Sequence, residues 1–284
     1  MKSIIILLTA ITCAMASVAQ TIDYSVFEKS IYGRNKDAGH YLTTRGFKMY
    51  YETYGEGEPL LIIHGNGGSI NNFVYQIPFF QKDYKVIIAD SRAQGKSTDD
   101  NDSLSYEMMA DDYNALLDSL HLKNAYVIGW SDGGINGLLL AIRHPDKVKK
   151  LAITGANLTP DTTAVDPFVY HWAMDMNDSL DKEKNKPEMK NERKLTHLLS
   201  YEPHIPLKDL HKIKCPTLVM GGDHDVLLPQ HTLLIAQNIK QSYLWIVPNS
   251  GHSIPVVYKD KFNAEVKDFF VKPYREIKGL SRLE

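Results

Sequence analysis

A serine between two glycines carries the strongest chemical signal in the sequence. Ser131 lies in the segment 129–133, Gly-Trp-Ser-Asp-Gly, which follows one apolar run and opens another. A nucleophilic serine on a sharp strand-to-helix turn needs strained backbone angles and no bulky side chains two positions away, and Gly129 and Gly133 meet that need. The N-terminus of the following helix also favours a developing anion. The segment therefore predicts that Ser131 is the nucleophile of an acyl-transfer reaction.

Such a serine needs a base and a carboxylate that orients the base. Two aspartates, Asp223 and Asp225, follow the seventh strand-like run of the chain, and we favour Asp225 because it lies just before the apolar turn into the next helix. His252 follows the last strand-like run on a loop at the same predicted sheet edge. We therefore predict a triad in which His252 is the base and Asp225 orients it.

The tetrahedral oxyanion of acyl transfer needs backbone N–H donors. The glycine-rich turn 64–68, His-Gly-Asn-Gly-Gly, follows a strand-like run and is predicted to supply the N–H of Asn66, to be paired with the N–H of Asp132. For His64 in the same turn we favour a structural role, in which its ring braces the turn by hydrogen bonds.

The remaining sequence predicts the elements that position these groups. Eight apolar runs are predicted as strands: 41–44, 47–53, 60–63, 85–89, 125–128, 150–154, 216–220 and 243–247. The first two form an antiparallel hairpin, and the nearly continuous apolar character of the others indicates a parallel sheet covered by helices on both faces. Helical spacing marks 106–120, with Ser105 as N-cap, and 262–270. The predicted fold class is therefore α/β, a mostly parallel eight-stranded sheet with flanking helices.

About sixty residues separate the sixth and seventh strands, far more than an ordinary connection needs. We predict a helical cap insert at about 157–212 over the carboxyl edge of the sheet, where open α/β sheets bind ligands. Phe168 and Trp172 of this insert, together with Trp130, are predicted to line the substrate pocket; packing within the cap is an equally weighted alternative for the cap aromatics. The charged stretch 175–194 is predicted to form a solvated helix.

These residues, in this order, resemble the α/β-hydrolase superfamily. The segment 129–135, followed by His144-Pro145 and by 153–157, resembles in particular the valacyclovir hydrolase (biphenyl-hydrolase-like) branch. In the family-like stretch 90–97 the usual Arg-Gly pair is Arg92-Ala93, which puts the tightness of that loop in doubt. The resemblance implies an α/β-hydrolase fold over the domain 20–284 and a reaction that uses no metal or other cofactor.

Asp132, the residue after the nucleophile, has two interpretations. In the branch that the segment resembles, this aspartate is associated with the α-ammonium group of the substrate. The alternative is that its charge stabilises the helix N-terminus by about 0.3 to 1 kcal/mol, and we favour this alternative because acidic residues at helix starts are common without a ligand.

The first residues have the plan of a secretory signal peptide, with Lys2 followed by an apolar run and then by small residues. We predict a signal peptide at 1–19, cleavage before Gln20, and a periplasmic or extracellular location. A retained anchor is the less favoured alternative, because the run is too short to span a bilayer with stable flanks. Cleavage would leave Cys215 as the one thiol, predicted to be a buried apolar side chain.

Composition excludes some classes of function. With 43% hydrophobic and 23% charged residues the chain is not disordered, and its formal charge of −2 provides no long-range field that attracts nucleic acid or an anionic membrane. We therefore expect a small-molecule acyl substrate and a serine hydrolase that cleaves carboxylic esters, α-amino-acid esters among them. A C–C bond hydrolase or an aminopeptidase of the same fold is the alternative, and a non-catalytic binding protein a remote one. The oligomeric state stays open.

Overall fold

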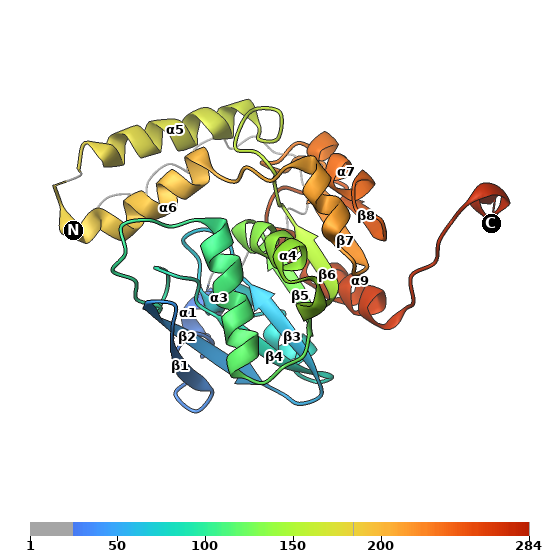
Figure 1. Cartoon of the computed structure of the whole chain (residues 1–284), viewed down its shortest axis with the longest axis horizontal. Coiled ribbons are helices and arrows are strands. Elements are labelled where there is room, and N and C mark those ends of the chain that lie inside the picture. The colour runs from blue at the N-terminus through green and yellow to red at the C-terminus, as the bar shows by residue number, and fades with distance from the viewer. Residues whose placement is uncertain (1–24, 184, 284) are drawn as a thin grey trace, which may run out of the picture.

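The computed structural model describes residues 25–183 and 185–283, so the predicted signal peptide lies outside the described residues and stays a prediction. Eight strands form one sheet in the order β1-β2-β4-β3-β5-β6-β7-β8 (Figure 1), and β2 alone runs antiparallel to its neighbours. The strands are β1 Gly39–Thr44, β2 Phe47–Tyr54, β3 Glu58–Ile63, β4 Tyr84–Ala89, β5 Ala125–Trp130, β6 Val148–Thr154, β7 Thr217–Gly222 and β8 Ser242–Val247. All eight predicted runs are strands, and the predicted fold class is confirmed.

Helices cover both faces of the sheet, as its apolar central strands require. One face packs against α3 (Tyr106–Ser119), α4 (Asp132–Arg143) and α7 (Pro229–Gln237). The other face packs against α2 (Ile77–Phe80), α8 (Ile254–Val257) and α9 (Lys259–Val271). Ser105 is the N-cap of α3, as predicted, because its hydroxyl accepts the N–H of Met108 at 3.2 Å. The short helix α1 (Ser25–Lys29) precedes the sheet.

Two helices lie between β6 and β7, within the range predicted for the cap. Helices α5 (Pro167–Asp181) and α6 (Lys190–Tyr201) run side by side across one end of the sheet (Figure 1). The prediction of one solvated helix over 175–194 is wrong in two respects. The stretch is divided between α5 and α6 by a turn at Pro187–Met189, where proline disfavours a continuing helix. In addition, Lys194 is buried.

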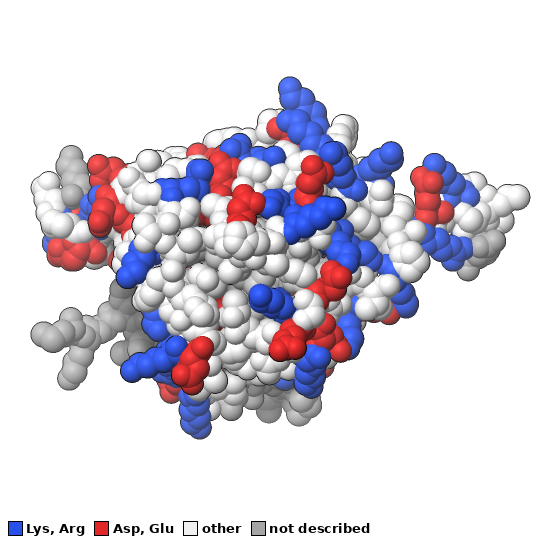
Figure 2. Space-filling model, turned by 60° about the horizontal axis from the view of Figure 1, so that its bottom comes forward, with Lys and Arg blue, Asp and Glu red and all other residues white. Residues whose placement is uncertain are grey.

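The surface and the single described thiol fit an ordinary globular protein. On the face that Figure 2 shows, basic and acidic side chains of the described residues are interspersed. Cys215 is buried, as predicted, and burial raises the pKa of its thiol to about 11. Among residues 25–183 and 185–283, no helix combines the length and the apolar character that a membrane crossing requires.

The loop after β4 shows how the departure from the family pattern is accommodated. Ala93, in the place of the usual glycine, has a φ of 62°, in the left-handed region. Two residues later Gly95 has a φ of 55°, and a Cβ there would lie 2.3 Å from the carboxylate of Asp90. The loop therefore keeps its tight geometry with an alanine at 93, at the cost of backbone strain. At position 95 glycine is required both by the left-handed φ and by the lack of space for a Cβ.

We predict that Ala93→Gly stabilises the protein. A left-handed alanine costs about 1 to 2 kcal/mol, and the greater freedom of glycine in the unfolded chain offsets about 0.4 to 1 kcal/mol of this. A net gain of about 0.5 to 1 kcal/mol in the free energy of unfolding is expected from urea titration. Ala141→Gly, at a buried position in the last turn of α4, is the control, with an expected loss of about 1 kcal/mol. A loss in both variants would contradict the strain at Ala93.

Candidate active site

Ser131 stands at the turn between β5 and α4 in a strained conformation. Its φ of 58° and ψ of −124° are rare for a residue other than glycine. The turn is forced by close backbone contacts: a Cβ on Gly133 would lie 2.0 Å from the carbonyl oxygen of Ile63, and one on Gly129 would lie 2.2 Å from the carbonyl oxygen of Gly133. Ser131 is anchored by its N–H, which donates to the Thr154 carbonyl at 2.9 Å.

His252 and Asp225 are in direct contact. The Nδ1 atom of His252 lies 2.6 Å from Oδ1 of Asp225. This buried carboxylate also accepts the N–H of Gly222 on Oδ2 (3.2 Å) and the N–H of Leu227 on Oδ1 (3.3 Å). Burial raises the pKa of Asp225. The hydrogen bond and charge of His252 and the two backbone donors lower this pKa by more than burial raises it, so the pKa lies below its usual value. An ionised Asp225 holds the proton of His252 on Nδ1 and leaves Nε2 as the basic nitrogen.

Asp223, the competing carboxylate, has a different task. Its oxygens accept the N–H groups of Asn249 at 2.9 Å and Ser250 at 3.0 Å, and His224 lies beside it at 2.8 Å. The two backbone hydrogen bonds hold the pKa of Asp223 well below its usual range. Asp223 therefore fixes the loop that carries His252, while Asp225 contacts the imidazole itself.

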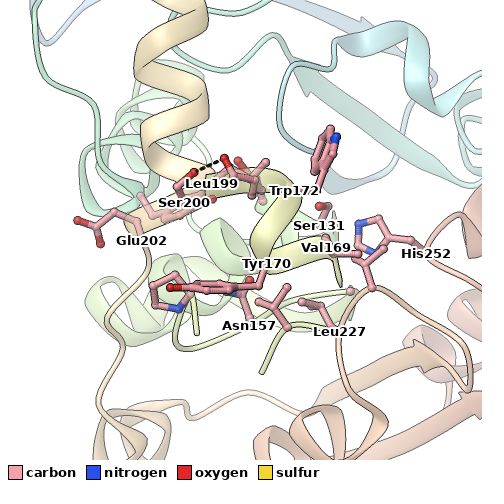
Figure 3. Close-up of a pocket in the computed structure, with 17 residues that line it drawn as sticks. Ser131, Asn157, Val169, Tyr170, Trp172, Leu199, Ser200, Glu202, Leu227 and His252 are labelled. Atoms are coloured by element: carbon pink, nitrogen blue, oxygen red, sulfur yellow. Dashed lines mark hydrogen bonds between the residues drawn. The ribbon is translucent and has the colours of Figure 1, made fainter. Parts of the chain in front are cut away.

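The ring of His252 lies against the end of β6. A Cβ on Gly155 would lie 2.6 Å from Cε1 of His252, so only glycine leaves room for the ring there. The indole Nε1 of Trp130 donates to the backbone carbonyl of His252 at 2.9 Å. Ser131 and His252 line the same cavity and lie side by side in Figure 3. The structure thus brings together the three residues that the sequence analysis predicted as a triad.

The turn after β3 lies against the nucleophile. A Cβ on Gly65 would be 2.9 Å from Cβ of Ser131. His64 is fully buried: its Nδ1 lies 2.7 Å from the carbonyl of Gly65, and its Nε2 accepts the N–H of Ser91 at 2.9 Å. Burial lowers the pKa of His64 to about 4, which keeps the ring neutral and able to accept that hydrogen bond. The ring braces the turn, in agreement with the favoured structural role.

The predicted oxyanion donors both lie beside Ser131. Among the described residues, no other residue accepts a hydrogen bond from the N–H of Asn66 or from the N–H of Asp132, and the Asp132 carboxylate lies near its own N–H. The second of these belongs to the first residue of α4, where the helix dipole adds positive potential. Two N–H groups that no other residue occupies, next to a strained serine, provide what stabilisation of a tetrahedral oxyanion requires.

Asp132 is a buried carboxylate, with 2% of the residue exposed. Its Oδ2 accepts Nδ2 of Asn66 at 2.9 Å, and the Tyr106 hydroxyl forms a second hydrogen bond with the carboxylate. Burial raises the pKa of Asp132 to about 6, even though these hydrogen bonds lower it. Tyr106 was missed by the sequence analysis as a site residue, since its helical spacing indicated only a core position.

A cavity of about 220 Å³ extends from Ser131 and His252 beneath the cap helices (Figure 3). Its lining is mostly apolar and includes Tyr170 and Trp172 of α5 and Glu202 just after α6, at the end opposite to Ser131. A smaller cavity of about 140 Å³ also borders Ser131 and His252.

The predicted pocket aromatics divide between these cavities and the surface. Trp172 lines the larger cavity and is 51% exposed, and Trp130 lines the smaller one. Phe168 is 79% exposed and lies outside the lining of both cavities, because it is at the solvent-facing start of α5. Tyr170, which the sequence analysis did not select, lines the larger cavity instead. Helical spacing alone does not tell which face of α5 turns inward.

The arrangement has the groups that acyl transfer requires. It provides a serine on a strained turn, an imidazole oriented by an ionised carboxylate, and two N–H donors. In the part of the chain that the structure describes, no group of three or more His, Cys, Asp and Glu side chains is arranged to hold a metal ion.

Comparisons with known proteins agree with the fold described above. Residues 58–198 match the protein family described as alpha/beta hydrolase fold. The chain is 28% identical over 248 residues to the serine hydrolase BPHL of Mus musculus. The aligned region covers 80% of this chain and 84% of that protein. It is 25% identical over 261 residues to a 2-hydroxy-6-oxononadienedioate/2-hydroxy-6-oxononatrienedioate hydrolase of Comamonas testosteroni, covering 78% and 91% of the two chains.

Among solved structures, the enol-lactonase of Burkholderia xenovorans LB400 has the same fold. The TM-score is 0.68 at 21% sequence identity, and the superposition covers 82% of this chain and all of the other.

The raised pKa of Asp132 predicts a pH-dependent cost to stability. Because the folded protein binds this proton more tightly than the unfolded chain, the contribution of Asp132 is most favourable at low pH and is lost as the pH rises through about 6. Asp132→Asn removes this dependence. In urea titrations the variant should gain on the order of 2 to 3 kcal/mol relative to wild type between about pH 4 and pH 7.

The control for this experiment is Asp146→Asn, whose side chain is 94% exposed, with no such gain expected. A difference between wild type and Asp132→Asn that stays constant over the same pH range would contradict the raised pKa.

Proposed function

Because the chain belongs to the α/β-hydrolase superfamily and is an enzyme, we propose that it hydrolyses carboxylic esters of small acyl compounds through Ser131, His252 and Asp225. The observation that carries the proposal is the 2.6 Å contact between His252 and Asp225, in the cavity where Ser131 stands in its strained conformation. The mouse serine hydrolase among the relatives supports the same class of reaction.

In the proposed reaction, Oγ of Ser131 attacks the ester carbonyl while Nε2 of His252 takes the hydroxyl proton. The carbonyl oxygen becomes an oxyanion held by the N–H groups of Asn66 and Asp132. The C–O bond to the alcohol then breaks, and the imidazolium returns the proton to the leaving oxygen. Water attacks the acyl-enzyme with His252 again as base, which releases the acid and restores Ser131. Asp225 stays ionised and stabilises the imidazolium throughout.

We further propose that the preferred acyl group carries a positive charge, as in α-amino-acid esters. The described lining of the larger cavity includes two acidic residues, Asp132 and Glu202, and neither lysine nor arginine; the Glu202 carboxylate points away from Ser131 (Figure 3). An unbalanced negative potential in a largely apolar cavity favours a cation and disfavours an anion. The hydrogen bonds from Asn66 and Tyr106 support a structural role for Asp132, while its place beside Ser131 is where an α-ammonium group would lie.

The C–C bond hydrolase remains the second candidate, because the same triad serves both reactions and the Comamonas testosteroni relative bears such a name. The substrate in that name is a dicarboxylate. A cavity with Asp132 and Glu202 in its lining would repel two further negative charges, so the charge of the site favours the ester.

The triad predicts the effects of three substitutions on hydrolysis of a p-nitrophenyl ester. Ser131→Ala should abolish turnover with folding intact, and Asp225→Asn should lower kcat by about 10⁴, because the imidazole loses its oriented tautomer. Asp223→Asn is the matched control for Asp225→Asn, with a loss below about tenfold expected, since Asp223 holds the loop of His252 through backbone N–H groups and does not contact the imidazole. Undiminished turnover by Ser131→Ala would overturn the mechanism.

The proposed charge preference predicts substrate discrimination. Wild type should hydrolyse an α-amino-acid ester with a kcat/KM about 30-fold above that of its N-acetyl analogue, the factor that corresponds to about 2 kcal/mol for a desolvated charge pair. The ratio should collapse in Asp132→Ala if this carboxylate holds the ammonium group, and in Glu202→Gln if the distal one does. Equal rates on both substrates in wild type would remove the ammonium site.

A further inference from the structure

A buried lysine anchors the cap to the rest of the protein. Lys194 of α6 is 8% exposed, and its Nζ donates to Oδ2 of Asp99 at 3.0 Å and to the carbonyl of Asn101 at 2.8 Å. Asp99 belongs to the long loop after β4, so this ion pair connects the cap helix to the body of the fold. Burial raises the pKa of Asp99. The hydrogen bonds of Lys194 and Asn101 and the charges of Lys194 and Arg92 lower this pKa by more than burial raises it, so the carboxylate stays ionised.

The ion pair continues into the core as a chain of four charges. The second oxygen of Asp99, Oδ1, accepts Nη1 of Arg92 at 3.1 Å. Arg92 is 1% exposed and makes two hydrogen bonds with Asp112 of α3, at 2.7 and 2.8 Å. Two positive and two negative groups are thus paired inside the protein, and the partly exposed Arg45 also donates to Asp112 at 2.9 Å. Such a chain contributes little net stability but fixes the positions of its members, because removing one partner leaves a buried charge without compensation.

The next residue of α6 contacts the oxyanion turn. The carbonyl of Leu195 accepts Nδ2 of Asn66 at 3.0 Å, and the same nitrogen donates to Oδ2 of Asp132 at 2.9 Å. Asn66 is the residue whose backbone N–H is a proposed oxyanion donor. One amide nitrogen therefore joins the cap helix, the turn after β3 and the first residue of α4, directly beside the end of the ion chain.

We propose that Lys194 is a positioning residue for the ester hydrolysis, acting through α6 and Asn66 to hold the N–H of Asn66 where the oxyanion forms. The inference rests on the proposed function. Donors of this kind act only when they lie about 2.7 to 3.1 Å from the developing oxyanion. A small shift of the turn therefore reduces the stabilisation of the transition state and leaves substrate binding nearly unchanged.

The first test compares two lysines of the same helix in the full chain, with a p-nitrophenyl ester as substrate. Lys194→Met should lower kcat by about 10- to 100-fold and change KM by less than about threefold. Lys190→Met is the control, because this half-buried lysine reaches the same loop at the carbonyl of Asp100 (2.6 Å) and at Asp102 (2.6 Å) but is not paired with the buried Asp99. Its kcat should stay within about twofold of wild type. A folded Lys194→Met variant with the kcat of wild type would overturn the proposal.

The second test asks whether Lys194 acts through Asn66. Asn66→Ala removes the side-chain amide and keeps the backbone N–H, and it should lower kcat as Lys194→Met does. If both act on one donor, the double variant should lose no more than about threefold beyond the larger single loss. A double loss equal to the product of the single losses would show two independent effects and overturn the proposal.

A third variant keeps the test decisive if Lys194→Met does not fold. Lys194→Met combined with Asp99→Asn removes both charges of the pair, so no unpaired carboxylate stays buried at 99. Circular dichroism and thermal unfolding establish that it is folded, and its kcat should still show the 10- to 100-fold loss. If this double variant keeps the kcat of wild type, the positioning role of Lys194 is overturned and the proposed function is not. If wild type shows no ester hydrolysis that depends on Ser131, the proposed function and this inference are both overturned.

Discussion

The close approach of α4 to the strands beneath it is the constraint on which the site depends. Only glycine fits at 129 and 133, because a Cβ at either place would fall within 2.2 Å of a backbone atom. Packing at this distance leaves Ser131 a φ of 58°, which turns its hydroxyl away from the sheet and into the cavity beneath the cap. The same approach sets the N–H of Asp132 at the start of α4 beside that hydroxyl. Nucleophile and oxyanion donor therefore result from a single packing contact.

The other catalytic groups reach this point because the carboxyl ends of neighbouring parallel strands share one edge. Strands β7 and β8 pair in register and deliver Asp225 and His252 on adjacent loops, which Asp223 connects through backbone hydrogen bonds. Gly155, at the end of β6, provides the space that the imidazole occupies. Function is thus concentrated in loops that are held by buried hydrogen bonds, while the buried side chains of the strands and helices beneath them are mostly apolar.

The sequence predicts those parts of the site that have local signals. Each strand is an apolar run, and Ser131, Asp225 and His252 follow such runs within a few residues, so their meeting at one edge follows from the topology. Lys194 and Tyr106 have no such signal. Lys194 lies in a stretch of mixed charge that is typical of a solvated helix, and its partner Asp99 is 95 residues away in the chain. The hydroxyl of Tyr106 meets Asp132 only because α3 packs beside α4, a tertiary contact that helical spacing does not contain.

Charge at the site has to be local, since the chain as a whole carries a formal charge of only −2. A carboxylate at 132 opposes the oxyanion that its own N–H would stabilise, and burial already raises its pKa to about 6. Hydrogen bonds from Asn66 and Tyr106 compensate part of this charge. A cation on the substrate would compensate the rest and lower the pKa of Asp132, because an ammonium group favours the ionised form. The carboxylate that impedes the reaction of a neutral ester would then select a cationic one, and the cap that encloses it strengthens that choice by excluding water.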